Sequence, residues 1–539
     1  MAIASVYLGP IDIADLEASN MSIPAECTVL VVGGGPGGSY AASVLAREGI
    51  DTVLLEADVF PRYHIGESML PSLRHFLEFN GALPEFEAHG FNMKKGAAFK
   101  FNSKLPGYTD FLKAGGPHNY TWNVLRSEAD SILFHYAGEC GCKTFDGVKV
   151  TSLEFRATEP SVNGNVGFPE SASWTRRDKG TGSIQFEYLV DASGRAGLMS
   201  TKYLKDRRYN EGLKNTAIWG YFKNAATYGV GTSMEGSPYF SRLEDASGWT
   251  WRIPLHNRTT SVGVVQHQNS VKAKKQAMGS PSSKDYFLSC LHEVSGIMDL
   301  IEGAELVSEV RSASDWSYNA SSYAAANVRI IGDAGCFIDP LFSSGVYLAL
   351  LGALSAAATI CASMKGQCSE QAAGKWHSEK VRDAYTRFLL VVSSAYAQMV
   401  HKDRPVLNEL GENSFDRAFD IIRPTKSTLS SNPRNSRREW KIAEKEVQES
   451  IEFCVRVLLK IDHEQSGVHT ESARAGHIFQ QDELENMKHI IMNSNETFTL
   501  DSFGADVIDG LTANIKRGSL GLEIVGDTCS HDNFLLRAA

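Results

Sequence analysis

The first apolar segments of the chain alternate between strand-like and helix-like patterns. Residues 27–32 are a run of apolar and β-branched side chains, which is typical of a buried strand. Small and apolar residues over 39–48 then predict a helix, and a second apolar run at 52–55 predicts another buried strand. A strand, a helix and a strand in this order predict a parallel sheet and an α/β fold.

Further along, short alternating runs separated by turn residues predict a β-rich region with mixed sheets at about 96–320. A strand at 328–331 is followed by Gly345–Met364, 20 residues without a charged side chain. A segment of this length is long enough to cross a membrane. Because it is rich in Ala, Gly and Ser rather than in Leu, Ile and Phe, we expect a buried helix and no membrane span.

These patterns predict three parts. Residues 1–22 form an N-terminal arm, which lacks the basic start and the long apolar stretch of a signal peptide. Residues 23–365 form a dinucleotide-binding module interleaved with the β-rich region, which we expect to hold the substrate. Residues 366–539 are expected to be mainly helical, with a polar linker at about 424–438.

The turn between the first strand and the helix, Gly33 to Gly38, fits the pattern G-x-G-x-x-G. In such a turn Gly33 permits the tight bend, Gly35 lets the backbone approach a pyrophosphate, and Gly38 lets the helix pack closely on the strand. Glu56 ends the second strand and is placed to hold ribose hydroxyls. The alternative is a glycine-rich turn without a ligand. Since the fingerprint occurs once, no separate Rossmann site for a nicotinamide is expected.

The charge balance excludes some partners, and the cysteines indicate a compartment. The chain has 53 basic and 63 acidic side chains and a formal net charge of −10. Because phosphate backbones attract basic surfaces, neither nucleic acid nor an anionic membrane is expected as a partner. The 9 cysteines are scattered without the spacing of a zinc site, so we expect reduced thiols, a cytoplasmic protein and no metal.

Three further segments identify the dinucleotide as FAD. Residues 190–195 resemble the mid-chain strand and turn of flavoprotein monooxygenases, and Gly332-Asp333-Ala334 resembles their second FAD motif, in which the Asp contacts the cofactor. Residues 249–254, Trp-Thr-Trp-Arg-Ile-Pro, fit W-x-W-x-I-P, a signature of flavin-dependent halogenases. The chain therefore resembles that family. Four more segments resemble its fungal branch, which acts on phenolic and aromatic polyketides: residues 64–72, 96–100, 122–127 and 339–346.

The resemblance implies a fold, a reaction and partners. The fold is the FAD-binding Rossmann-type fold of the aromatic hydroxylases, with a mixed β-sheet substrate region and a mainly helical C-terminal region. A separate flavin reductase supplies reduced FAD, which with oxygen converts chloride or bromide to hypohalous acid. An active-site lysine then directs the halogen onto a phenolic or aromatic small molecule, free or tethered to a carrier. The alternatives are a single-component FAD aromatic hydroxylase and a non-catalytic flavin-binding protein.

Positions that match the family imply roles for individual residues. Ser344 and Gly345 match positions whose backbone N–H groups hold the halide, which suits a turn that opens a helix. An ordinary helix start is the alternative for this turn. Arg126 is expected near the flavin, and a structural ion pair is its alternative. The residues expected to contact FAD are Gly33, Gly34, Gly35, Gly37, Gly38, Glu56, Glu67 on the loop that straps the flavin, Arg126, Asp333 and Val346.

The resemblance places the catalytic lysine at Lys94. If residues 93–101 form one strand, Lys94 shares a face with Gly96, Ala98 and Lys100, and Lys95 points to the other face. The resemblance also implies an internal tunnel that leads hypohalous acid to the lysine, and the pattern of alternation does not say which face lines it.

Two aromatic features complete the implied site. Trp249 and Trp251 share one strand face, and in the family they wall off the flavin from the substrate; ordinary core residues are the alternative. Bacterial tryptophan halogenases carry a glutamate where this chain has Phe342. This difference favours a phenol over an indole, because the oxygen of a phenol activates its own ring.

Overall fold

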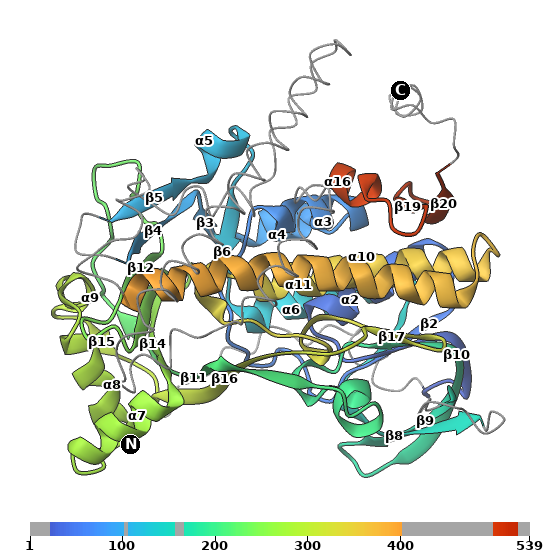
Figure 1. The fold of residues 1–539 in the computed structure, drawn as a ribbon, viewed down its shortest axis with the longest axis horizontal. Coiled ribbons are helices and arrows are strands. Elements are labelled where there is room, and N and C mark those ends of the chain that lie inside the picture. Colours follow the sequence, from blue (N-terminus) through green and yellow to red (C-terminus); the bar gives the residue numbers. More distant parts are fainter. Residues whose placement is uncertain (1–21, 102–105, 157–166, 401–499, 526–539) are drawn as a thin grey trace, which may run out of the picture.

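The protein is described here from a computed structural model, which covers residues 22–101, 106–156, 167–400 and 500–525 (Figure 1). The expected N-terminal arm, apart from residue 22, and the expected polar linker at about 424–438 lie outside the described residues.

A largely parallel sheet forms one half of the molecule. Strand β1 (Glu26–Val32) pairs in parallel with β2 (Thr52–Leu55) and with β10 (Thr181–Asp191). Beyond them lie β18 (Val328–Ile330), parallel to β10, and β7 (Lys143–Phe145), parallel to β2. The predicted parallel sheet is confirmed. The short strand β17 (Ala324–Ala325) pairs with β18 at one end, which gives the strand order β17-β18-β10-β1-β2-β7.

The register of this sheet brings distant motifs to one edge. Val32 lies opposite both Leu55 and Asp191, and Asp191 lies opposite Ile330. The carboxyl ends of the strands therefore align, and the turns that follow them meet. Ligands of open parallel sheets bind at this edge.

Each face of the sheet is covered by a different layer. One face packs against α2 (Pro36–Arg47), α6 (Arg126–Glu139) and α10 (Ser344–Met364). The other packs with the antiparallel strands β8 (Val148–Arg156) and β9 (Phe168–Arg176). Helix α2 begins before the predicted residue 39 because Pro36 has the helical φ already fixed and needs no N–H in the first turn.

Helix α10 runs through the core, as its composition predicts. Its length and composition would allow a membrane span, but 83% of its most apolar stretch is buried within the protein. The many alanine and glycine residues of α10 let this helix lie close to α2. The structure therefore confirms a buried core helix.

A second, mixed sheet forms the other half (Figure 1). It is built around β11 (Arg208–Lys223), β13 (Gly248–Pro254) and β14 (Thr259–His267), in the order β15-β11-β14-β13-β12-β4-β5. One face is covered by three helices, and the other faces the large core shared with α10. The remaining strands of this sheet are β4 (Gly96–Lys100), β5 (Gly107–Asp110), β12 (Tyr239–Arg242), β15 (Glu305–Leu306) and β16 (Arg311–Asn319). The helices of this half are α5 (Phe111–Gly115), α7 (Gln268–Ala277), α8 (Ser283–His292) and α9 (Ser295–Ile301).

The expected single strand over 93–101 is wrong. The chain forms two strands, because β3 (Asn92–Lys94) pairs with β6 (Thr121–Asn123) while β4 joins the second sheet. Lys95 stands at the break, where its carbonyl accepts a hydrogen bond from Phe111 N at 2.9 Å. The alternation of side chains between two strand faces therefore does not continue from Lys94 to Gly96. The tertiary packing decides where each lysine points.

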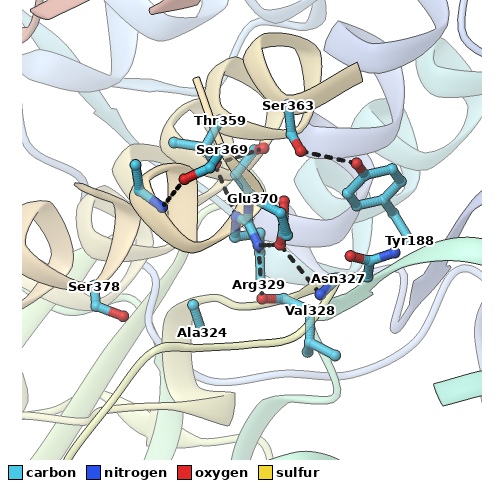
Figure 2. Close-up of polar contacts among 12 residues, drawn as sticks. Tyr188, Ala324, Asn327, Val328, Arg329, Thr359, Ser363, Ser369, Glu370 and Ser378 are labelled. Carbon is cyan, nitrogen blue, oxygen red and sulfur yellow. Dashed lines mark hydrogen bonds and ion pairs between the residues drawn. The ribbon is translucent and has the colours of Figure 1, made fainter. Parts of the chain in front are cut away.

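An ion pair with a buried guanidinium holds the end of the first sheet against the long helices (Figure 2). Arg329 of β18 is fully buried and donates to both carboxylate oxygens of Glu370, at 2.6 and 3.0 Å. Its Nε also donates to Thr359 Oγ1 of α10 at 2.9 Å. Glu370 begins α11 (Glu370–Val400), which packs along α10. Removing Glu370 would leave the buried guanidinium of Arg329 without its counter-ion, so this contact keeps β18 and the turn after it in place.

The described end of the chain returns to the first half. It contains α16 (Leu500–Ala505) and a hairpin of β19 (Leu511–Asn514) and β20 (Gly521–Ile524), which packs against α10. The sequence analysis did not predict this hairpin. Between β2 and α6 lie α3 (Ser72–Asn80) and α4 (Leu83–His89), which follow the loop that carries Glu67.

Candidate functional site

The glycine turn after β1 combines tight packing with one open position. A Cβ on Gly38 would overlap the carbonyl oxygen of Gly33, and Gly33 itself has φ +106°, which favours glycine. A Cβ on Gly35, by contrast, would have only the Arg62 guanidinium within 4 Å, at 3.5 Å. The space in front of Gly35, at the start of α2, is therefore open to a ligand. This fits the pyrophosphate of FAD.

Glu56 lies beside this turn, as predicted. Its Oε2 accepts a hydrogen bond from Gly34 N at 2.5 Å, and its Oε1 accepts one from Asp58 N at 2.8 Å. The carboxylate thus fixes the glycine turn from the end of β2. Gly37, on the other side of the turn, packs against α10, where its Cβ would lie 3.2 Å from Ala349.

The loop between β2 and α3 buries a carboxyl group. Glu67 is 2% exposed, and its Oε1 accepts a hydrogen bond from Tyr221 Oη at 2.7 Å. Its Oε2 is buried and has no hydrogen-bond partner among the described residues. Burial raises the pKa of Glu67 to about 7. A buried polar atom without a partner fits a position that contacts a cofactor.

Arg126 holds the same loop from α6. Its Nε and Nη2 donate to the two carboxylate oxygens of Asp130 at 2.8 and 3.0 Å. Its Nη1 donates to the carbonyl of Ile65 at 2.9 Å. The structural ion pair that was the alternative for Arg126 is therefore present, and contact of Arg126 with the flavin stays a prediction.

The two flavoprotein motifs named from the resemblance meet at the carboxyl edge of the first sheet. Asp333 lies in the turn after β18, and Arg195 lies in the turn after β10. Arg195 Nε is 4.0 Å from Asp333 Oδ2. The parallel register of β10 and β18 explains why residues so far apart in sequence are neighbours here.

The turn that opens α10 has the features of an anion site. Ser343 has φ +58°, a left-handed conformation that turns the chain into the helix. The N–H groups of the first helical turn, which includes Ser344, Gly345 and Val346, have no partner within the helix. Ser344 is 1% exposed, and its Oγ is buried without a hydrogen-bond partner among the described residues. A halide would satisfy these donors.

Lys94 is buried, whereas Lys95 is exposed. Lys94 is 2% exposed, and its Nζ donates to the carbonyl of Met69 at 2.8 Å and lies 5.3 Å from the ring centroid of Phe111. Burial lowers the pKa of Lys94 to about 7. In the part of the chain that the structure describes, no carboxylate forms an ion pair with Lys94.

The two tryptophans of the W-x-W-x-I-P segment belong to a row of aromatic rings. Trp249 and Trp251 are 1% and 5% exposed, with ring centroids 5.8 Å apart. The row continues through Phe240, 6.2 Å from Trp249, and Phe99, 5.1 Å from Phe240. It ends at Phe342, 5.7 Å from Phe99, just before the turn that opens α10. The tryptophans are therefore core residues, and this row of ring contacts leads from them to the residue before the candidate halide turn.

Comparison with known proteins decides the family. The family model described as tryptophan halogenase matches residues 28–117 and 107–419. The flavin-dependent halogenase ascD of Acremonium egyptiacum is 49% identical over 93% of this chain and 93% of its own length. The sulochrin halogenase gedL of Aspergillus terreus is 49% identical over 93% of this chain and 94% of its own.

The chain belongs to the tryptophan halogenase family of flavin-dependent halogenases. The flavin-dependent halogenase CmlS has the same fold, with a TM-score of 0.65 and 26% identity over 92% of this chain and 84% of CmlS. The expected fold, the enzyme class, the FAD cofactor and the halide substrate are confirmed by this membership. Both of these relatives come from fungi.

Three polar residues that the sequence analysis missed tie Trp249 of this halogenase to the segment before α10. Trp249 Nε1 donates to Tyr396 Oη at 2.8 Å, and Tyr396 Oη donates to Asp339 Oδ2 at 2.7 Å. Asn215 Nδ2 also donates to Asp339 Oδ2, at 2.8 Å. Asp339 lies in a segment that resembles the family, but nothing in the sequence around Tyr396, on α11, marks it as part of the site.

One group of metal-ligating side chains lies outside the site. His89 Nε2 and His256 Nε2 are 2.8 and 3.1 Å from Glu128 Oε2. These are hydrogen-bond and ion-pair distances between partly exposed side chains. They account for the cluster without a metal.

The burial of Lys94 gives the halogenase a stability that depends on pH. Its folded-state pKa of about 7 lies below the ordinary value of about 10.4, so between these values the unfolded chain binds more protons. As pH falls from about 10 to 7, Lys94→Met should therefore gain stability relative to the wild type, and the difference should level off below about pH 7. Denaturant midpoints measured across this range check it. Lys95→Met, at an exposed position, should show no such trend. A difference for Lys94→Met that does not change with pH would contradict the burial.

Proposed function

We propose that this halogenase places chlorine or bromine on a phenolic or aromatic polyketide-type small molecule, free or tethered to a carrier, through hypohalous acid and Lys94. The observation that carries the proposal is the buried Nζ of Lys94, whose pKa is lowered to about 7. At neutral pH both the amine and the ammonium are then populated. The amine can be halogenated, and the ammonium can donate a hydrogen bond to hypohalous acid.

The surroundings of Lys94 support this role. Among the described residues, its Nζ has one hydrogen-bond acceptor, the Met69 carbonyl, and an aromatic ring nearby, so it keeps further donor capacity. A lysine held by a carboxylate would stay charged, and no such pair occurs among the described residues. An amine of this kind is suited to receive an electrophile.

The aromatic row supports a phenolic substrate. Phe342 is 2% exposed and packs on Phe99 and Phe101. An apolar ring therefore stands where the bacterial tryptophan halogenases carry a carboxylate. A phenol needs no added base there, because its own oxygen activates the ring. One relative is named for its action on sulochrin, and we infer that this halogenase acts on a related class of fungal metabolite.

The residues at the carboxyl edge of the first sheet would hold FAD, which supplies the oxidising chemistry when bound. The open position at Gly35 would receive the pyrophosphate, and Glu56 the ribose. Asp333 would contact the ribityl and phosphate region, and Glu67 the flavin end. Val346 lies in the first turn of α10 and would complete the flavin contact beside the halide, held by Ser344 and Gly345.

The halogenase should depend on a separate flavin reductase. Its single dinucleotide fingerprint is used for FAD, so no second fingerprint is left for a nicotinamide. We expect the purified protein with FAD to oxidise NADH only slowly, and to make product when a reductase is added. Absorbance at the NADH band measures this. Rapid NADH oxidation by the isolated chain would contradict the prediction.

The proposed reaction can be tested directly. The halogenase is incubated with a flavin reductase, FAD, NADH, chloride or bromide, and a panel of phenolic polyketides, and the products are read by isotope-pattern mass spectrometry. We expect halogenated phenols that disappear when halide is omitted. Hydroxylated products in place of halogenated ones would mean that the protein acts as an aromatic hydroxylase on these substrates.

We also propose a cytoplasmic location. The described cysteines Cys27, Cys140, Cys142, Cys290, Cys336, Cys361 and Cys368 are all free thiols. Free thiols are typical of a reducing compartment.

A further inference from the structure

The loop between β2 and α3 is joined to β11 by a continuous chain of hydrogen bonds. Trp219 Nε1 donates to Tyr63 Oη at 2.7 Å, and Tyr63 Oη lies 2.9 Å from Tyr221 Oη. Tyr221 Oη in turn donates to Glu67 Oε1 at 2.7 Å. Two phenols therefore connect an indole with a buried carboxyl.

The two ends of this chain have different surroundings. Tyr63 is 44% exposed, whereas Glu67 is 2% exposed. The second carboxyl oxygen of Glu67 is buried and unpartnered among the described residues, so it is available to a ligand. Burial raises the pKa of Glu67 to about 7, and both protonation states are therefore populated near neutrality.

The direction of the hydrogen bonds follows from the indole. An indole N–H can only donate, so Trp219 always occupies a lone pair of Tyr63 Oη. When Glu67 is ionised, Tyr221 donates to it and Tyr63 donates to Tyr221. When Glu67 is protonated, both phenols can turn, and Tyr63 can donate outward to water. One proton moves inward each time the chain completes this cycle.

We propose that Tyr63, Tyr221 and Glu67 form a relay that brings a proton from solvent to the hypohalous-acid step. The proposal rests on the hypohalous-acid route proposed above. That route consumes a proton: one FADH2, one O2, one chloride and one proton give FAD, one hypochlorous acid and one water. Oxygen takes two electrons from the reduced flavin and two from chloride. The proton arrives on Oε1 of Glu67 from Tyr221, and rotation of the carboxyl group brings it to the side of the buried Oε2, where it leaves the relay.

The charged and polar groups around the relay come from four elements. Arg126 of α6 and Ser261 of β14 both lower the pKa of Glu67, against the effect of burial, as does Tyr221 of β11. The guanidinium of Arg311, from β16, lies 4.1 Å from the ring centroid of Tyr63. Because Tyr221, Ser261 and Arg126 offset part of the effect of burial, both the protonated and the ionised form of the Glu67 carboxyl are accessible near neutrality.

The test cuts the relay at its outer end. Tyr63→Phe removes the solvent-side hydroxyl and leaves the bond between Tyr221 and Glu67 in place. We expect hypohalous acid formation to slow at least about 100-fold in Tyr63→Phe and Tyr221→Phe, the low end for proton transfer by a positioned side chain. The solvent deuterium isotope effect should rise, and the affinity for FAD should stay the same. Tyr209→Phe is the matched control, since Tyr209 is also 44% exposed and lies on β11 outside the relay.

A second readout needs no turnover. Infrared titration of the apoprotein, with Glu67→Gln to identify the band, follows the Glu67 carboxyl. Tyr221→Phe should raise the Glu67 pKa further, because it removes a hydrogen bond that stabilises the carboxylate, and Tyr63→Phe should leave it nearly unchanged. A slow Tyr63→Phe variant then reports a broken relay and not an altered carboxyl.

The outcomes separate the relay from the proposed function. If the wild type makes hypohalous acid and both tyrosine variants keep its rate and isotope effect, the relay is wrong and the function stands. If the wild type itself makes none, the proposed function fails and the relay fails with it.

Discussion

Lys94→Met should stop halogenation while leaving flavin oxidation in place. The methionine keeps most of the buried volume but removes the nitrogen that either takes the halogen or donates to hypohalous acid. We expect halogenated product to fall at least about 100-fold, as is usual when a group that acts in proton transfer or covalent catalysis is removed. Hypohalous acid should still form, because the lysine acts after the flavin chemistry. Product is measured by mass spectrometry and hypohalous acid by a chemical trap in the same reactions.

Lys95→Met is the matched control. Lys95 is exposed and stands at the break between β3 and β4, so its loss should leave product formation close to the wild-type rate. Lys94→Ala is a second test of the same nitrogen with a smaller side chain. If Lys95→Met loses product and Lys94→Met keeps it, the assignment of the lysine is wrong by one residue. If both variants remain active, this halogenase does not use a lysine in this segment.

Gly35→Val should weaken FAD binding in a folded protein. In the structure a Cβ at this position meets only the flexible end of Arg62, at 3.5 Å, and φ is −68°, so the substitution strains neither packing nor backbone. The added methyl groups would instead enter the space that a pyrophosphate needs. Overpacking against a rigid group costs ~1–3 kcal/mol, so we expect the Kd for FAD to rise by up to about 100-fold. Fluorescence titration with FAD measures the affinity, and circular dichroism checks the fold.

Gly38→Ala is the contrasting variant. Its Cβ would overlap the backbone of Gly33, so we expect loss of stability and not a selective loss of FAD. The two glycines of one fingerprint thus separate ligand access from packing. Unchanged FAD affinity in a folded Gly35→Val protein would show that the pyrophosphate lies elsewhere.

The sequence alone determined the parts of this protein that depend on local patterns. Strand β1, the glycine turn and strand β2 follow from apolar runs and from a turn that only glycine can make. The buried helix α10 follows from its uncharged, small-residue composition. The family likewise follows from short segments, above all the tryptophan motif at 249–254, because such segments carry residue identity and spacing without any need of the fold.

Only the tertiary structure decided how distant side chains combine. The break at Lys95 arises because β3 and β4 join different sheets, and no alternation pattern within nine residues can report a change of partner strand. Tyr396 reaches Asp339 and Trp249 only because α11 lies along α10. The chain from Tyr63 through Tyr221 to Glu67 likewise joins a loop to a strand more than 150 residues away. Burial and hydrogen bonding of this kind depend on which elements pack together, and it is this packing that lowers the pKa of Lys94 and raises that of Glu67.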